Sequence, residues 1–254
     1  MWKNAVKISV VVWICILLMS WASCAHAGIM WWGILGGASS AVCTDANPVG
    51  NCTGFVLCQN FQTATTGWDN SETWSVAGTV DPVSTSPALR GTQSASIANS
   101  SSISHALSDL AEFYAFARWQ FADVTPSAGT TFFKANHGGS QIGSIILNTN
   151  GKLSCGHGVS TNTASTALSN TTMYYIWFHH KSDPAGLAGI MTAEVSTTRD
   201  YADVNAALGC SVTNGADTDA HTSLLWLQAN VDGGAGISID QILVKETEIG
   251  TVCE

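Results

Sequence analysis

Short β-rich runs separated by turn residues are the feature of this sequence that most restricts its fold. From Gly54 onward, runs of β-branched and aromatic residues alternate with clusters of Gly, Ser, Thr, Asn and Asp. This texture is typical of a β-sandwich or barrel. The sequence has no stretch with a sustained helical period rich in Leu, Glu and Lys. We therefore predict an all-β chain with two packed antiparallel sheets.

Period-two alternation places the strands. It is clearest over 112–121, where Phe or Ala or Trp occupies every second position from Phe113 to Phe121. The best helical pattern covers 106–117, but it runs directly into this strand. Further along the chain, Asn150-Gly151 is a strong hairpin-turn signal between two predicted strands. The predicted strands are 55–61, 72–76, 94–98, 112–121, 130–136, 142–148, 152–155, 172–181, 189–196, 223–229 and 237–245.

The N-terminal segment has the organisation of a signal peptide. Lys3 and Lys7 form a basic start, and residues 8–19 are apolar apart from one serine. Ala25-His26-Ala27 then offers the small-x-small pattern of a cleavage site. One alternative is an uncleaved N-terminal anchor, because residues 8–27 just supply the roughly 20 apolar residues that a bilayer-spanning helix needs. The others are a lipoprotein at Cys24, where Trp21 stands in place of the usual lipobox Leu, and a translation start at Met30, which would remove the export signal.

Cleavage after Ala27 would divide the chain into three parts. These are the signal peptide (1–27), a Gly/Ser/Cys-rich lead-in (28–53) and one large domain (54–254). We therefore expect a secreted protein, or one on an extracellular or periplasmic surface. Loss of the two lysines in the first part would take the net charge from −9 to −11. The negative field of such an acidic chain repels the phosphate groups of nucleic acids and of anionic lipids. We therefore expect no nucleic-acid partner and no membrane contact beyond the possible anchor.

An even number of cysteines follows the expected cleavage site. An even count behind an export signal predicts up to three disulfides and leaves their connectivity open. A zinc site is the alternative, although the sequence contains no CxxC pair and no Cys/His cluster with finger spacing. Cys43–Cys52 is the most natural local bridge. The six candidates are Cys43, Cys52, Cys58, Cys155, Cys210 and Cys253.

Five segments follow one another in a familiar order along the chain. They are GFVLCQNFQ, GWDNSETWSV, SPALRGTQSASIA, YYIWFHHKSDPAGLAGIMTAEVST and ISIDQILVKE. This order resembles the concanavalin A-like lectin/glucanase (LamG-like) superfamily over about 54–244. The resemblance implies a two-sheet antiparallel jelly-roll sandwich with a polysaccharide or glycan as partner. It also implies structural calcium as a candidate cofactor, with Asp240 at the ligand position, where the alternative is a hydrogen-bonded aspartate that fixes the last strand.

Catalytic motifs of that superfamily are missing from the sequence. Its glucanases carry Glu-x-Asp-x-Glu on one strand, because alternate residues share a face and act together on the sugar. Here only Glu246 and Glu248 have this spacing, beyond the last predicted strand and without an intervening Asp. An alginate-lyase-like set is incomplete as well, since Gly143 stands where that family has His. We therefore assign no catalytic residues.

Planar polar and basic side chains recur on neighbouring predicted strands. Alternation should bring them to one cupped sheet face that binds a glycan, and a solvated outer face is the alternative. The adjacent His179 and His180 should point to opposite faces, so that they cannot share a metal ion. The candidate glycan-binding residues are Arg118 and Gln120, Lys134 and Asn136, and His179 and Lys181.

Three functions remain open at this stage. The first is a non-catalytic, lectin-like carbohydrate-binding module that is secreted or displayed on a surface. The second is a divergent polysaccharide lyase or glycoside hydrolase. The third is a structural surface or virion appendage subunit, in which the same face contacts a neighbouring protein. The oligomeric state does not follow from the sequence.

Overall fold

The computed structural model shows that the prediction of an all-β sandwich is correct. In the part of the chain that it describes, the single helical element is the three-residue 3-10 turn η1 (Tyr201–Asp203). No helix in that part is therefore able to cross a bilayer. The expected signal peptide and most of the expected lead-in lie outside this part. The described residues are 52–59, 61, 73–89, 91, 93–183, 188–215, 222–229 and 236–252.

The larger of the two sheets holds eight strands within the described residues. They are β1 (Leu57–Gln59), β3 (Val80–Ser84), β4 (Ser94–Ile97), β6 (Glu112–Phe121), β11 (Met173–Lys181), β12 (Gly189–Ser196), β13 (Cys210–Gly215) and β15 (Ile237–Lys245). Their order is β13-β12-β11-β6-β15-β4-β3, and β1 also pairs with β15. All of these pairings are antiparallel, and β6 and β15 lie in the interior of the sheet.

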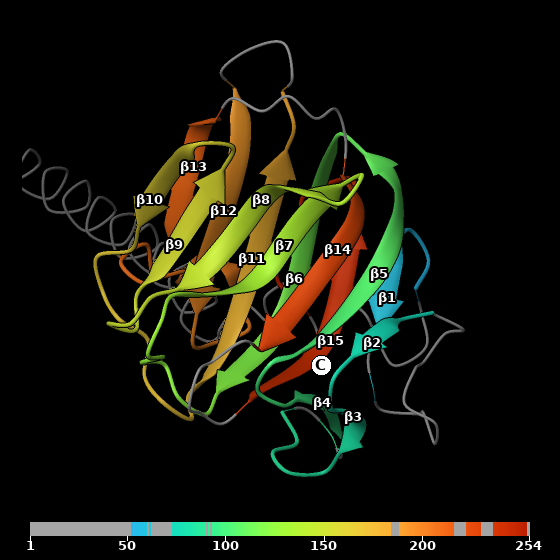
Figure 1. The fold of residues 1–254 in the computed structure, drawn as a ribbon, viewed down its shortest axis with the longest axis vertical. Coiled ribbons are helices and arrows are strands. Elements are labelled where there is room, and N and C mark those ends of the chain that lie inside the picture. The colour runs from blue at the N-terminus through green and yellow to red at the C-terminus, as the bar shows by residue number, and fades with distance from the viewer. Residues whose placement is uncertain are drawn as a thin grey trace, which may run out of the picture. The chain divides into compact units, whose positions relative to one another are not determined.

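The smaller sheet lies over the larger one (Figure 1). Its strands are β2 (Ser75–Ala77), β5 (Ser101–Leu110), β7 (Thr130–His137), β8 (Ser140–Leu147), β9 (Leu153–His157), β10 (Ser160–Thr163) and β14 (Thr222–Ala229). Their order is β10-β9-β8-β7-β14-β5-β2, and these pairs are antiparallel too. The chain crosses between the two sheets several times, for example between β6 and β7.

Alternating apolar side chains fill the space between the sheets. Trp119 of β6 packs edge-on against Phe132 of β7 and Phe178 of β11, with ring centroids 5.0 and 6.2 Å apart. Large aromatic side chains from both sheets therefore interlock, as in a β-sandwich core. The inward-facing residues of β6 are those that the alternation predicts, namely Phe113, Ala115, Ala117, Trp119 and Phe121, and each is at most 2% exposed.

The opposite face of the larger sheet, called the outer face below, is also partly apolar. Phe116, Trp177 and Leu243 lie on it and are nearly inaccessible to solvent. Ile249, beyond the end of β15, packs against them. The indole nitrogen Nε1 of Trp177 donates a hydrogen bond to the Gly250 carbonyl oxygen at 3.1 Å. The segment after β15 therefore folds back and covers part of the outer face.

Two disulfides join the four described cysteines. Cys52–Cys58 closes a short loop at the start of β1, and Cys155–Cys210 joins β9 of the smaller sheet to β13 of the larger. The prediction of disulfides is confirmed for these residues. The predicted local bridge Cys43–Cys52 is wrong, because Cys58 lies with its Cα 5.6 Å from that of Cys52, within bridging distance, and is bonded to it. The two remaining candidates, Cys43 and Cys253, lie outside the described residues.

Candidate functional site

The six candidate glycan-binding residues do not share one face. Four of them lie on β6 and β11 of the larger sheet, whereas Lys134 and Asn136 lie on β7 of the smaller sheet. The expectation of one common surface is therefore wrong for Lys134 and Asn136. Strands that follow one another in the sequence were expected to be neighbours. However, the chain changes sheet after β6, and β7 pairs with β8 and β14.

Arg118 is buried within the outer face. It is 1% exposed and has Tyr175 of β11 and Asp240 of β15 as its cross-strand partners. Its guanidinium carbon lies 5.4 Å from the centroid of the Tyr175 ring, which is cation–π geometry. An arginine at this depth cannot reach a ligand that approaches from solvent.

Asp240 does not fit the predicted role of a calcium ligand. Its side chain is inaccessible to solvent, and the register places the permanent cation of Arg118 opposite it. Calcium needs six to eight oxygen ligands. In the described part of the chain, no three His, Cys, Asp or Glu side chains are grouped so as to hold a metal ion. The described side chains around Asp240 therefore do not supply the set of ligands that a structural calcium ion needs.

Three further candidates are partly or fully buried. The Gln120 side-chain amide donates to the Thr171 carbonyl oxygen at 2.7 Å. Asn136 is 6% exposed, and burial lowers the pKa of the Lys134 ammonium. Glycan binding by Gln120, Lys134 and Asn136 stays a prediction.

The last two candidates, His179 and Lys181, join an ionic cluster with Glu112. The Nε2 atom of His179 lies 2.8 Å from Glu112 Oε1, and the Lys181 ammonium lies 3.8 Å from Oε2. A carboxylate only accepts hydrogen bonds, so Nε2 carries the hydrogen. The Tyr114 ring stacks on the imidazole at 4.2 Å, and its hydroxyl donates to Glu112 at 3.3 Å. These contacts hold the His179 ring in one orientation.

The charges of this cluster act on one another. Burial alone raises the pKa of Glu112, but the hydrogen bond from His179 and the charges of Lys181 and His179 outweigh burial and lower that pKa. Burial and the Glu112 carboxylate raise the pKa of Tyr114. The Tyr114 phenol therefore stays protonated and remains a hydrogen-bond donor.

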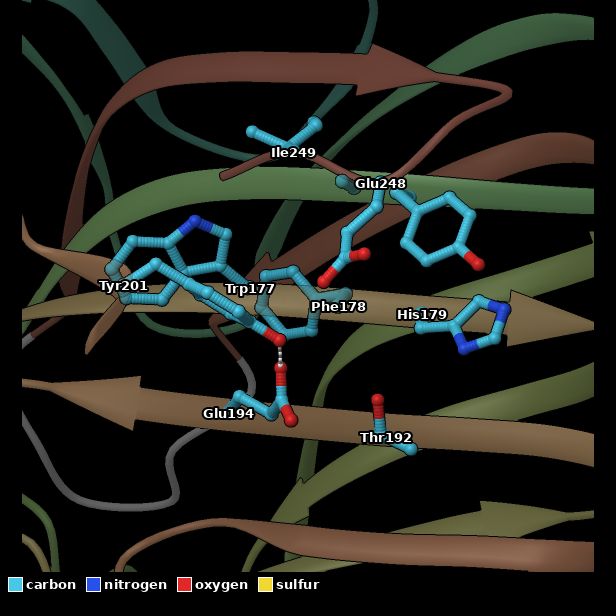
Figure 2. Close-up of a pocket in the computed structure, with 10 residues that line it drawn as sticks. Trp177, Phe178, His179, Thr192, Glu194, Tyr201, Glu248 and Ile249 are labelled. Carbon is cyan, nitrogen blue, oxygen red and sulfur yellow. Dashed lines mark hydrogen bonds between the residues drawn. The ribbon is translucent and has the colours of Figure 1, made fainter. Parts of the chain in front are cut away.

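A cavity of about 230 Å³, the first hollow, opens beside this cluster (Figure 2). Strands β6, β11 and β12, the turn η1 and the segment after β15 supply its walls. It therefore combines side chains that are far apart in the sequence. The side chains that decide its chemistry are Tyr114, Trp177, His179, Thr192, Glu194, Tyr201 and Glu248.

Two carboxylates approach the Tyr201 hydroxyl in the first hollow. This hydroxyl donates a hydrogen bond to Glu194 of β12, and Figure 2 shows the Glu248 carboxylate directed toward the same region. Burial, the bond to Glu194 and the charges of both glutamates raise the pKa of Tyr201. Trp177 packs edge-on against the Tyr201 ring, with centroids 5.3 Å apart. Tyr201 is thus a neutral, fixed donor, and the carboxylates keep lone pairs for other donors.

The hollow offers several kinds of group to a ligand. Carboxylates accept hydrogen bonds, the Thr192 hydroxyl accepts and donates, and the rings of Tyr114 and Tyr201 provide flat apolar surface. The lysine beside it, Lys181, already faces Glu112, and so does the His179 imidazole. The arrangement therefore favours ligands that bring hydroxyl or other donor groups and disfavours anions.

Sequence reasoning missed Glu194, Tyr201 and Glu248. They come from β12, from η1 and from the segment after β15, so no local spacing connects them. One signal was available, because Thr192 and Glu194 occupy alternate positions of a predicted strand. In the sequence, that predicted strand is the next one after the strand of His179.

Comparisons with known proteins bear on the fold. No protein-family model matches the sequence, and no curated protein matches it. Solved structures do match in three dimensions. The binding domain of botulinum neurotoxin DC in complex with SialylT has a TM-score of 0.52 at 11% identity, over 77% of this chain and 48% of that one. The chain thus spans about half the length of that binding domain.

Two other solved structures are similar to the same extent. A sialidase from Trypanosoma rangeli in complex with sialic acid has a TM-score of 0.53 at 10% identity, over 91% of this chain and 37% of that one. The cellulose-induced protein Cip1 has a TM-score of 0.54 at 16% identity, over 78% of this chain and its entire own length. At such low identity, these matches show the fold: the chain is an antiparallel β-sandwich.

Proposed function

We propose that this protein is a secreted or surface-displayed, concanavalin A-like module that binds a glycan in the first hollow. The observation that carries this proposal is the meeting of aromatic rings, the Thr192 hydroxyl and carboxylate acceptors in one cavity on the outer face. Sugars bind through flat apolar contacts together with hydrogen bonds to their hydroxyls, and small-molecule sites combine apolar walls with a few placed polar groups.

Structural neighbours give this proposal further support. The toxin domain was solved with SialylT and the sialidase with sialic acid. A third neighbour comes from work on botulinum neurotoxin type C, whose cell entry depends on interaction with two ganglioside molecules. Proteins with this architecture therefore include several whose ligands contain carbohydrate.

The charge of the hollow favours an uncharged glycan. Glu194 and Glu248 both face the cavity, and the neighbouring Lys181 ammonium already lies close to Glu112. A sialic acid or uronate carboxylate would bring a like charge into this space, which costs free energy. Neutral hydroxyls, in contrast, donate directly to the two glutamates. We therefore expect neutral glycans to bind more tightly than sialylated or uronic ones.

Glycan-array binding of the purified protein, followed by calorimetric titration of the positive glycans, tests the proposal. Tyr114→Ala and Glu194→Ala should each weaken binding at least about tenfold, equivalent to about 1.4 kcal/mol, because each removes contacts that a bound sugar makes. Lys152→Ala is the matched control, since Lys152 directly precedes β9 of the smaller sheet and lies outside the lining of the first hollow, and it should bind like the wild type. Absence of glycan binding, or equal binding by all three variants, would show the proposal to be wrong.

A glycoside hydrolase is the second candidate, and one observation favours it. Glu194 and Glu248 present two carboxylates to the same cavity, and most glycoside hydrolases act through a pair of carboxyl groups. The test is the release of reducing sugar from neutral polysaccharides by the wild type and by Glu248→Gln. Release by the wild type alone would favour the hydrolase. Binding without release would favour the module.

A further inference from the structure

A second hollow lies beside the first, at the edge of the sandwich where β10 of the smaller sheet meets β13 of the larger one. Its volume is about 390 Å³, and it shares two wall residues, Thr192 and Glu194, with the first hollow. The rest of its wall comes from β10 and the two residues after it, from Ala193 of β12, from β13 and from the segment between η1 and β13. The two cavities are therefore neighbours, and the hydrogen-bonded pair of Tyr201 and Glu194 stands at their junction.

A row of polar side chains connects the two hollows. Tyr114 of β6 pairs in register with His179 of β11, His179 with Thr192 of β12, and Thr192 with Ser211 of β13. Cross-strand partners point to the same side of a sheet. The row thus runs across four adjacent strands, from the first hollow into the second. Three inter-strand steps make it roughly 14 Å long, which is longer than a single sugar ring.

The second hollow has the chemistry of a site for an uncharged, hydroxyl-rich unit. Among the described residues that line it, Glu194 alone carries a charge, and the others are small, hydroxyl-bearing or amide-bearing. Asn162 is fixed in its wall, because its amide donates to the Ser211 carbonyl oxygen at 2.8 Å and its Oδ1 accepts from the Thr163 backbone at 2.8 Å. Ser165 donates to the Ala207 carbonyl oxygen at 3.3 Å. The wall is thus held in place before any ligand arrives.

We infer that the second hollow is a further sugar subsite, so that the ligand is a neutral, linear oligosaccharide lying across the strands from Tyr114 to Ser211. This inference rests on the proposed function and narrows it to a class of ligand. A single sugar would occupy the first hollow alone. A longer chain would continue past Glu194 and gain the contacts of Thr192 and Ser211.

The test is the dependence of affinity on ligand length. Calorimetric titration would use linear β-1,4-linked oligomers of glucose, mannose and xylose, from one to six units. For the series that binds, affinity should rise at least about tenfold between two and four units and then level off. Ala206→Trp adds bulk to an exposed residue of the second hollow and should reduce the affinity for four units to that for two. Ala202→Trp, an exposed position of η1 outside both cavities, is the matched control and should retain the length dependence.

The results separate failure of this inference from failure of the proposed function. If oligomers bind with one affinity at every length, or if Ala206→Trp leaves the length dependence intact, the second subsite is wrong and glycan binding stands. If other glycans on the array bind while all three linear series fail, the inference is overturned in the same way. If neither the array nor the oligomers show binding, both the inference and the proposed function are wrong.

Discussion

Acid should destabilise this protein through one buried histidine, His180. Its side chain is inaccessible to solvent and lies between the sheets, as the prediction of opposite faces for His179 and His180 requires. Its ring lies 5.3 Å from that of His157 and 5.4 Å from that of Phe113. Its Nδ1 lies 3.2 Å from the Thr222 hydroxyl. A proton added here would place a charge in a space with no carboxylate among these contacts.

The size of the effect follows from the pKa. Burial, then the charges of His157 and His179, lower the pKa of His180 from 6.5 to about 3. The unfolded chain therefore binds a proton near pH 6.5, whereas the folded chain does not bind it until about pH 3. The part of the unfolding free energy that depends on His180 is therefore fully present above pH 6.5. It falls as the pH drops toward 3, by about 1.4 kcal/mol per pH unit. At pH 4.5 the loss due to His180 is roughly 2–3 kcal/mol.

Urea unfolding followed by tryptophan fluorescence at pH 7.5 and pH 4.5 measures this loss. Carboxylates also titrate in this range, but they contribute equally to the wild type and to a His180→Gln variant. The drop in unfolding free energy between the two pH values should therefore be about 2–3 kcal/mol smaller in the variant, whatever its stability at pH 7.5. His137→Gln, at a half-exposed histidine, is the control. Equal drops in the wild type and in His180→Gln would refute the reasoning.

Three further substitutions test the packing described above. Gly143→Ala would place its new carbon 2.7 Å from the His180 ring, so we expect a loss of about 1–3 kcal/mol in thermal or urea unfolding. Replacing both Cys155 and Cys210 by Ala opens a link between residues 55 apart, and the loop-entropy model gives a loss of about 4 kcal/mol; an unchanged unfolding midpoint would contradict it. Asp240→Asn leaves a buried guanidinium without the opposite charge and should cost roughly 3 kcal/mol, measured by urea unfolding at pH 7.5.

Strands with strong alternation could be predicted from the sequence, and weakly patterned ones could not. The alternation over 112–121 identified both faces of β6 correctly, because its inward positions carry the apolar side chains of the core. Strand β5 was missed because serine dominates its sequence. The helical pattern over 106–117 is in fact the end of β5 and the start of β6. The chain passes there from the smaller to the larger sheet without Gly or Pro, and Asp109, near the end of β5, has a φ of 48°.

The candidate site was harder to predict than the strands that carry it. His179 was identified, since planar polar residues on a predicted strand are visible in the sequence. Its partners could not be found in this way, because they depend on pairings between distant segments. Glu112 meets His179 only because β6 pairs with β11, and Tyr201 reaches Glu194 only because η1 packs beside β12. Neither the pairing of these two strands nor the position of η1 can be derived from the sequence pattern.

The interior position of β15 in the larger sheet governs when this protein can fold during its synthesis. This strand pairs with β6, β4 and β1, all of which leave the ribosome more than a hundred residues earlier. At about 5–20 residues per second, those strands wait on the order of ten seconds for their central neighbour. During that interval their hydrogen-bonding edges are unpaired and prone to aggregation, so chaperone supply and translation rate should strongly affect the yield of recombinant material.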